Sequence, residues 1–358
     1  MKKVFEVFLR FLFLGCISFG GPAAHIGYFQ KIFVFKLKWL DQTSYANLIS
    51  LSQFLPGPGS SQLGFAIGLR QAGLLGGIAA FIGFTLPSFV LLYLLAINLN
   101  TTEQAWVNHV IHGLKLLAVI VVADACLTMF KSFCNHHTHK LIAFITAISL
   151  VISPNLATQI FILFISAGFG FLVNPSLKTA TSQVTGPVAL DAVKCKALPL
   201  ILFFAILFVL PLLTRTELLI EQSALMVMFN QFYQAGSMVF GGGHVVLPLL
   251  QQTIGEMLSN DIFLTGYASA QAVPGPMFTI ATFLGAELFA QNPFLGASIA
   301  TLAVFLPGFL LLLAFESSWQ SLATKPNIAS AVMAVNAAVV GLLLSALYHP
   351  IFSSAVNS

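Results

Sequence analysis

The sequence predicts an all-α, polytopic membrane protein built from two homologous, inverted repeats. Only 7% of the 358 residues are charged and 58% are hydrophobic, and the mean hydropathy is +0.94, whereas about a quarter of the residues in a soluble domain are charged. Apolar runs of helical length follow one another along the chain, separated by short polar joints. The alternating pattern of a membrane β-barrel is absent, and several short motifs occur twice.

The duplicated motifs define the domain organisation. The first copy reads FGGP at 19–22, QFLPGP at 53–58, GLLG at 73–76 and LPSF at 86–89. The second copy reads FGGG at 240–243, QAVPGP at 271–276, PFLG at 293–296 and LPGF at 306–309. Each motif lies 218 to 221 residues after its counterpart in the first copy, a nearly constant offset. We expect a first repeat at 1–100, connecting helices and loops at 101–217, a second repeat at 218–315 and a C-terminal helix at 316–358. Internal repeats are typical of membrane transporters, whose site lies between them.

The segments around Pro-Gly-Pro are too short to cross a bilayer. Residues 45–55 and 59–69 contain eleven residues each, so each would rise about 16 Å as a helix, roughly half of a ~30 Å hydrocarbon core. Pro56 and Pro58 remove two backbone donors and disfavour a helix just before them. We therefore predict two half-helices that meet near the midplane as a re-entrant segment, with a similar break at the FGG motif.

The positions of the basic residues favour the inverted arrangement. If the broken segments of the first repeat enter and leave on the cytoplasmic side, full spans follow at about 74–97, 107–130, 140–153, 156–173, 197–213, 294–315 and 327–349. Thirteen of the fifteen Lys and Arg residues then lie inside, one lies outside, and Lys115 lies within a span. A full span in place of the first broken segment would instead export Lys31, Lys36 and Lys38, against the positive-inside trend.

The predicted half-helix ends have the chemistry of an anion site. Helix N-termini offer unpaired N–H groups and a positive dipole end, which suit tetrahedral oxyanions. Glycines at the tips allow close backbone approach, and Ser60, Ser61 and Thr279 add hydroxyl donors. The alternative is that Pro-Gly-Pro is only a bend and Ser60 an ordinary N-cap. We favour a site, because irregular backbone at membrane depth normally lines a cavity or is buried in protein.

Three further polar side chains have two interpretations each. Gln53 and Gln271 lie three residues before the matching prolines, where they either contact substrate or satisfy carbonyl groups that the prolines free. Arg70 follows Gly68 by two residues and either attracts a dianion or anchors the segment at the cytoplasmic interface.

Two sets of histidines occur between the repeats. His109 and Asp124 would lie within about 60° of each other on one helix. Either the two residues form a proton relay, or His109 only reaches the outer membrane interface. A second set, Cys134, His136, His137 and His139, could bind a metal, but its spacing is more typical of a solvated loop. We predict no metal site.

The strings SFGGPAAHIGYF, SQFLPGPGSSQLGFAIGLRQAGLLGG, FGGGHVVLPLL and QAVPGPMFTIATFLGA resemble the chromate ion transporter (CHR) family. The resemblance covers both homologous domains of that family, at about 5–90 and 228–310. It implies a multi-pass secondary transporter that exports chromate across the cytoplasmic membrane and confers chromate resistance. The second repeat departs from the first, because Gly243 replaces Pro22 and because His25 and His244 fall two places apart in the alignment.

We predict that the residues at the breaks and on their flanks contact the substrate. They are Gly20, Gly21, His25, Gln53, Pro56, Gly57, Pro58, Gly59, Ser60, Ser61, Arg70, Gly241, Gly242, His244, Gln271, Pro274, Gly275, Pro276 and Thr279.

Two other functions compete with chromate transport. Sulfate or another oxyanion would fit the same chemistry. An intramembrane enzyme could use His25, His244 or Asp124 as acid or base, but a nucleophile–base pair and a nucleotide or hydrolase signature are missing from the sequence. We therefore expect a transporter without enzymatic activity or cofactor, embedded in lipid, with no nucleic-acid partner and with a homodimer left open.

Overall fold

The computed structural model describes residues 1–99, 113, 120, 122–124, 126–153, 156–173, 196–215, 224–239, 246–319 and 325–348, and all regular secondary structure in them is helical. The predicted all-α fold is therefore confirmed. Three helices are long and apolar enough to cross a membrane: Gly59–Asn98, Pro293–Phe315 and Pro326–Ala346. The first of these is interrupted at Ala72 and Gly73.

The first repeat is broken where the sequence predicts. Its elements are α1 (Lys2–Ile17), α2 (Gly21–Phe29), the π-helix η1 (Gln30–Lys36), α3 (Gln42–Phe54) and α4 (Gly59–Leu99). The FGG motif separates α1 from α2, and Pro-Gly-Pro separates α3 from α4. Non-helical torsion angles at Ala72 and Gly73 divide α4 into a short half-helix and a long helix.

Asp41 begins α3 as an N-cap. Its carboxylate accepts hydrogen bonds from the backbone N–H of Ser44 at 2.9 Å and from the Ser44 hydroxyl at 2.7 Å. These two bonds favour the ionised carboxylate and hold the pKa of Asp41 below its usual value. The cap fixes the start of the half-helix that leads to the first Pro-Gly-Pro.

The second repeat has the same order of elements. It contains α9 (Ala224–Met238), α10 (Val246–Ile254), the 3₁₀ turn η4 (Gly255–Met257), α11 (Asn260–Ala272), the 3₁₀ turn η5 (Met277–Thr279), α12 (Ile280–Leu288) and α13 (Pro293–Phe315). Pro-Gly-Pro again separates two short helices, α11 and the η5–α12 segment. The second FGG motif lies outside the described residues.

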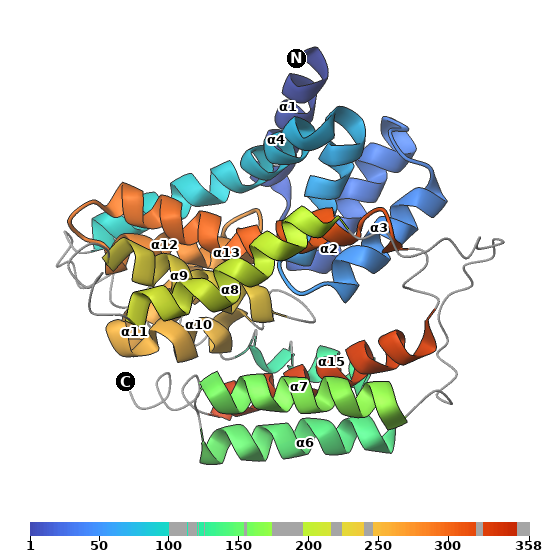
Figure 1. Ribbon diagram of the computed structural model, residues 1–358. Helices are drawn as coiled ribbons and strands as arrows, with labels where there is room; N and C mark the ends of the chain where they lie inside the picture. Colours follow the sequence, from blue (N-terminus) through green and yellow to red (C-terminus); the bar gives the residue numbers. More distant parts are fainter. Residues whose placement is uncertain are drawn as a thin grey trace.

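The remaining helices are α6 (His137–Ile152), α7 (Leu156–Val173), α8 (Ala197–Arg215) and α15 (Pro326–Ala346). Together with α13 and the long part of α4, they coincide with six of the predicted spans, and most of the seventh, at 107–130, lies outside the described residues. Helix α15 packs against both α6 and α7, and Figure 1 shows these three helices as one layer beneath the repeats. Helix α8 packs against α9 and α13.

Glycines allow the same close helix contacts inside each repeat. A Cβ atom on Gly15 of α1 would meet the backbone of Phe84 in α4, and one on Gly236 of α9 would meet the backbone of Val304 in α13. Small residues let helices approach closely in membranes. The glycine pairs that join each half-helix to the following long helix are also equivalent: Gly68 with Gly76, and Gly285 with Gly296. The repeats therefore share their packing as well as their motifs.

Labelling of single cysteines tests whether the repeats are inverted. With the four natural cysteines replaced, Gln42→Cys lies at the start of α3, and Gln252→Cys lies near the end of α10, ahead of the equivalent helix α11. Inverted repeats place these two residues on opposite sides of the membrane, so an impermeant maleimide should label each from a different side. Labelling of both from one side would contradict the inverted topology.

Candidate functional site

The first break presents free hydrogen-bond donors in a buried setting. Leu55 is extended, and the first helical bond of α4 runs from the Gln62 N–H to the Pro58 carbonyl at 2.9 Å. The three preceding N–H groups have no acceptor within the helix. Ser60 and Ser61 are 5% and 3% exposed, and the Ser61 hydroxyl has no hydrogen-bond partner. Backbone and side-chain donors therefore gather at one helix end.

The second break lacks this arrangement. Met277 and Phe278 stand where the first repeat has Gly59 and Ser60, and they form a 3₁₀ turn rather than the start of an α-helix. The Thr279 hydroxyl donates to the Pro276 carbonyl at 2.6 Å, and the Thr279 N–H donates to the same oxygen at 3.0 Å. The hydroxyl donor of this break is thus engaged within the protein, among apolar side chains.

Each Pro-Gly-Pro tip is hydrogen-bonded to the other repeat. The Gly57 N–H donates to the Val239 carbonyl at 2.7 Å, and the Gly275 N–H donates to the Ser18 carbonyl at 2.9 Å. Ser18 and Val239 are equivalent residues that precede the two FGG motifs by one position. The two bonds are therefore equivalent: each repeat donates one hydrogen bond to the other, as a two-fold relation between the repeats requires.

The tips also pack against the LP-x-F helices of the opposite repeat. Gly57 has φ +122° and Gly275 has φ +105°, torsion angles that L side chains rarely adopt. A Cβ atom on Gly57 would lie 2.9 Å from Cα of Gly308, and one on Gly275 would lie 2.9 Å from Oγ of Ser88. Backbone conformation and space both require glycine at these two positions.

A glutamine that the sequence analysis did not single out stabilises the first tip. Gln62 is fully buried, and its Nε2 donates to the carbonyls of Pro56 and Gly308 at 3.0 Å each. Gln53 is exposed, and Nε2 of Gln271 donates to the Tyr267 hydroxyl at 3.2 Å. The carbonyl next to the first break is therefore satisfied by Gln62 rather than by Gln53. In the sequence Gln62 only ends a run of three polar residues after Pro-Gly-Pro, and nothing there marks it for this role.

The first FGG segment brings a histidine to the second tip. Gly20 and Gly21 both have positive φ values and begin α2, in which His25 is fully buried. Nε2 of His25 lies 3.2 Å from the Ser18 carbonyl oxygen, which also accepts the bond from Gly275. The predicted residues Gly241, Gly242 and His244 lie outside the described residues.

Arg70 joins the two repeats by an ion pair. Its Nε lies 3.3 Å from Oε1 of Glu316, which follows the last residue of α13. Both side chains are partly exposed, at 35% and 19%. Arg70 lies just before the interruption of α4 at Ala72 and Gly73. The ion pair therefore links this part of α4 to the C-terminal end of α13.

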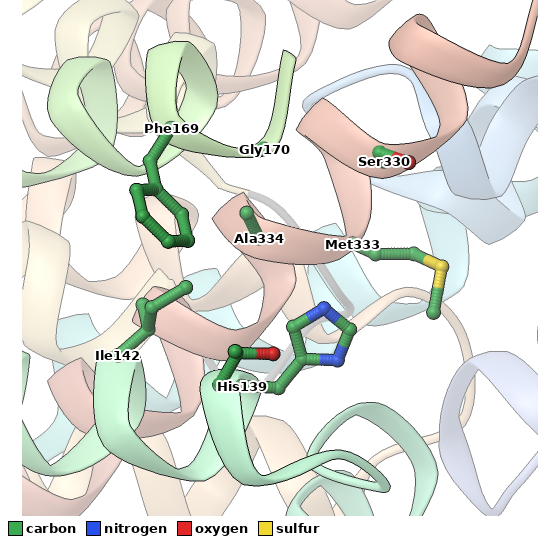
Figure 2. A pocket seen from close by; sticks show the side chains of 8 residues that line it. His139, Ile142, Phe169, Gly170, Ser330, Met333 and Ala334 are labelled. Carbon is green, nitrogen blue, oxygen red and sulfur yellow. The ribbon is translucent and has the colours of Figure 1, made fainter. Parts of the chain in front are cut away.

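The residues between the repeats lie apart from the two tips. Asp124 is exposed, and its predicted partner His109 lies outside the described residues. His139 is 4% exposed with Nδ1 unpartnered, so the expected solvated loop is wrong for this residue. It lines a cavity of ≈ 10 Å³ between α6, α7 and α15 (Figure 2), about the space of one water molecule. Among the described residues, no group of three His, Cys, Asp or Glu side chains is placed to hold a metal ion.

Comparison with known proteins identifies relatives over most of the chain. A family model described as chromate transporter matches residues 5–171 and 226–358. An uncharacterized transporter of Methanocaldococcus jannaschii is 27% identical over 95% of this chain and 82% of its own. The chromate transport protein of Pseudomonas aeruginosa is 26% identical over 94% of this chain and 79% of its own. That of Cupriavidus metallidurans is 26% identical, over 95% and 81% respectively. No solved structure matches.

Substitution of Gly57 tests the crossed packing of the tips. Gly57→Ala places a methyl group against the backbone of Gly308 at a positive φ, and strain of this kind costs about 1–3 kcal/mol. We expect a lower unfolding temperature in detergent and a loss of correctly folded protein in the membrane. Gly27→Ala is the matched control, since a Cβ atom there meets nothing within 4 Å. Equal stability of the two variants would contradict the contact.

Proposed function

Since the chain belongs to the chromate transporter family, we propose that it is a secondary transporter that exports chromate across the cytoplasmic membrane. The family match covers both repeats. Relatives from Pseudomonas aeruginosa and Cupriavidus metallidurans are named chromate transport proteins, and the described part of the chain contains three helices long and apolar enough to cross a membrane. The absence of a nucleotide-binding signature from the sequence supports transport driven by a gradient.

The observation that carries this proposal is the free donor set at the first break. Chromate is a tetrahedral dianion, and a protein must replace the water that it loses with several hydrogen bonds. The N-terminus of α4 supplies N–H groups and a positive dipole end, and Ser61 supplies a buried hydroxyl without a partner. We place the substrate against Gly59, Ser60 and Ser61.

The second break has a different role in this proposal. Its hydroxyl, on Thr279, already donates to the Pro276 carbonyl, and Met277 and Phe278 offer no side-chain donor. We propose that this tip holds the first FGG segment in place through Gly275 and so supports the first break. The contribution of Thr279 to the site is then structural.

The contacts between the repeats give the protein a way to change access. The tips of each repeat are held by the other repeat, and the Arg70–Glu316 pair is a further link between them. Rocking of one repeat against the other is the usual way in which such transporters alternate access. We propose that this motion rearranges the tip contacts and separates the ion pair.

Sulfate is the second candidate substrate. It has the same shape and charge as chromate, and a helix N-terminus with hydroxyl donors offers nothing that separates the two anions. The same donor set therefore supports a carrier for either oxyanion.

Removal of the Ser61 hydroxyl tests the proposed site. Loss of one buried hydrogen bond to a dianion costs about 1–3 kcal/mol, which raises the half-saturating chromate concentration by about 5- to 100-fold. Ser61→Ala should show this rise in proteoliposome flux of radiolabelled chromate. Ser50→Ala is the control, because Ser50 is exposed on α3 and bonds only to its own helix at the Ala46 carbonyl. A wild-type response of Ser61→Ala would place the substrate elsewhere.

Competition between anions tests selectivity. Sulfate should inhibit chromate flux at matched ionic strength, whereas chloride and nitrate should inhibit it much less, because they carry one charge and lack the tetrahedral set of acceptors. Equal inhibition by all three anions would indicate an unselective pore.

A further inference from the structure

One carbonyl oxygen joins a buried histidine to the contact between the repeats. The Ser18 carbonyl accepts the N–H of Gly275 at 2.9 Å and lies 3.2 Å from Nε2 of His25. His25 is fully buried in α2. A change in the strength of one of these bonds therefore acts on the other.

The partner of His25 determines its tautomer. A carbonyl oxygen only accepts hydrogen bonds, so Nε2 carries the hydrogen, and Nδ1 of the neutral ring keeps its lone pair. This assignment follows from the hydrogen-bond partner. Nδ1 is buried and has no partner. Nε2 is thus engaged in a hydrogen bond, whereas the lone pair of Nδ1 is free to bind a proton.

Two hydroxyl-bearing residues, Ser18 and Thr85, flank the contacts of the imidazole ring. Oγ of Ser18 and Oγ1 of Thr85 are both buried without a partner. Ser18 already contacts the ring through its carbonyl, and Thr85 follows Phe84, whose ring packs edge-on against the imidazole at 5.1 Å between centroids. At the other crossing, Val239 and Phe305 replace Ser18 and Thr85.

The elements packed around His25 bring no charged contact among the described residues. Phe29 lies on its own helix, Phe84 comes from α4, and Gly275 comes from the second tip. Tyr45 of α3 is a titratable group that contacts α2, because its hydroxyl donates to the Ile26 carbonyl. An imidazolium in such surroundings is costly without an anion in the protein core. Its formation is therefore linked to anion binding, and the linkage is reciprocal.

The first half-helix of α4 connects the two places. Gly64, three residues after Ser61, faces the ring of Phe29, four residues after His25. Helix α2 and α4 pack against each other. The proposed anion site and the histidine are therefore on directly contacting elements.

We propose that His25 is a proton-binding site, and that its protonation loosens the bond between the second Pro-Gly-Pro tip and the first repeat. A proton from water binds the Nδ1 lone pair, so that the ring becomes an imidazolium with two N–H donors. The Nε2–H···O bond becomes charge-assisted and shorter, which draws the Ser18 carbonyl away from Gly275. Release of the proton to water restores the contact. The coupling of this site to chromate movement rests on the proposed function.

Proteoliposomes with a pH-sensitive dye in the lumen test the coupling. Both compartments start at the same weakly alkaline pH, where chromate is a dianion, and a gradient of radiolabelled chromate drives flux. Wild-type protein should move chromate and change the lumenal pH together. Chromate flux without a pH change in the wild-type protein would overturn the proposal, whatever the variants do.

Two variants make the test specific. His25→Gln keeps a donor for the Ser18 carbonyl but does not titrate, so we expect a lumenal pH change per chromate at least about fivefold smaller than in the wild type. His139→Gln is the control, because it removes another buried histidine with an unpartnered Nδ1 that lies outside the repeats, and it should behave like the wild type. A wild-type proton movement in His25→Gln would contradict the proposal.

A direct titration separates this proposal from the proposed function. When ¹⁵N-histidine-labelled protein in nanodiscs is titrated with acid, the His25 ring should change from the neutral to the imidazolium signal at a higher pH with chromate present than without it. If the vesicles move no chromate, the transport proposal fails, and this titration alone decides the proton site. A His25 ring that stays neutral over the whole range would overturn it.

Discussion

The reciprocal hydrogen bonds of the two Pro-Gly-Pro tips are the contact on which the rest of the structure depends. Each tip has lost two backbone donors to proline, and its one remaining glycine N–H must find an acceptor because a buried donor without one is costly. The acceptor comes from the other repeat in both cases, at Val239 and at Ser18. Neither repeat can therefore complete its own break, and the two half-sites form only together.

The repeats have diverged on this shared scaffold. The first break keeps Gly59, Ser60 and Ser61 where the second has Met277, Phe278 and Thr279, so a buried hydroxyl without a partner, that of Ser61, remains at the first break and not at the second. Ser18 and Thr85 of the first repeat have the apolar counterparts Val239 and Phe305 in the second. We propose that the two-fold scaffold carries an anion-binding end at the first break and a proton-binding end at His25, coupled through the contact between α2 and α4.

The sequence predicts the breaks well because proline and glycine act locally. Two prolines around a glycine interrupt the helix at both Pro-Gly-Pro motifs, whereas the single prolines Pro87 and Pro307 lie inside α4 and α13. The nearly constant offset between the motifs identifies the repeats. The partners of the breaks could not be predicted in the same way. Gln62 bonds to Gly308, 246 residues away, and the matched position of Gln53 pointed to a role at the carbonyl that Gln62 fills. Such pairings depend on how the repeats dock, which no local pattern records.

The central claim is that the substrate lies against the first break, and the anomalous scattering of chromium tests it most directly. In crystals of the protein grown with chromate, data collected above the chromium absorption edge should show one peak at the N-terminus of α4, within hydrogen-bonding distance of the Ser61 hydroxyl. A peak at the second break, between Pro276 and Thr279, or in the layer of α6, α7 and α15 with none beside Ser61, would contradict the account.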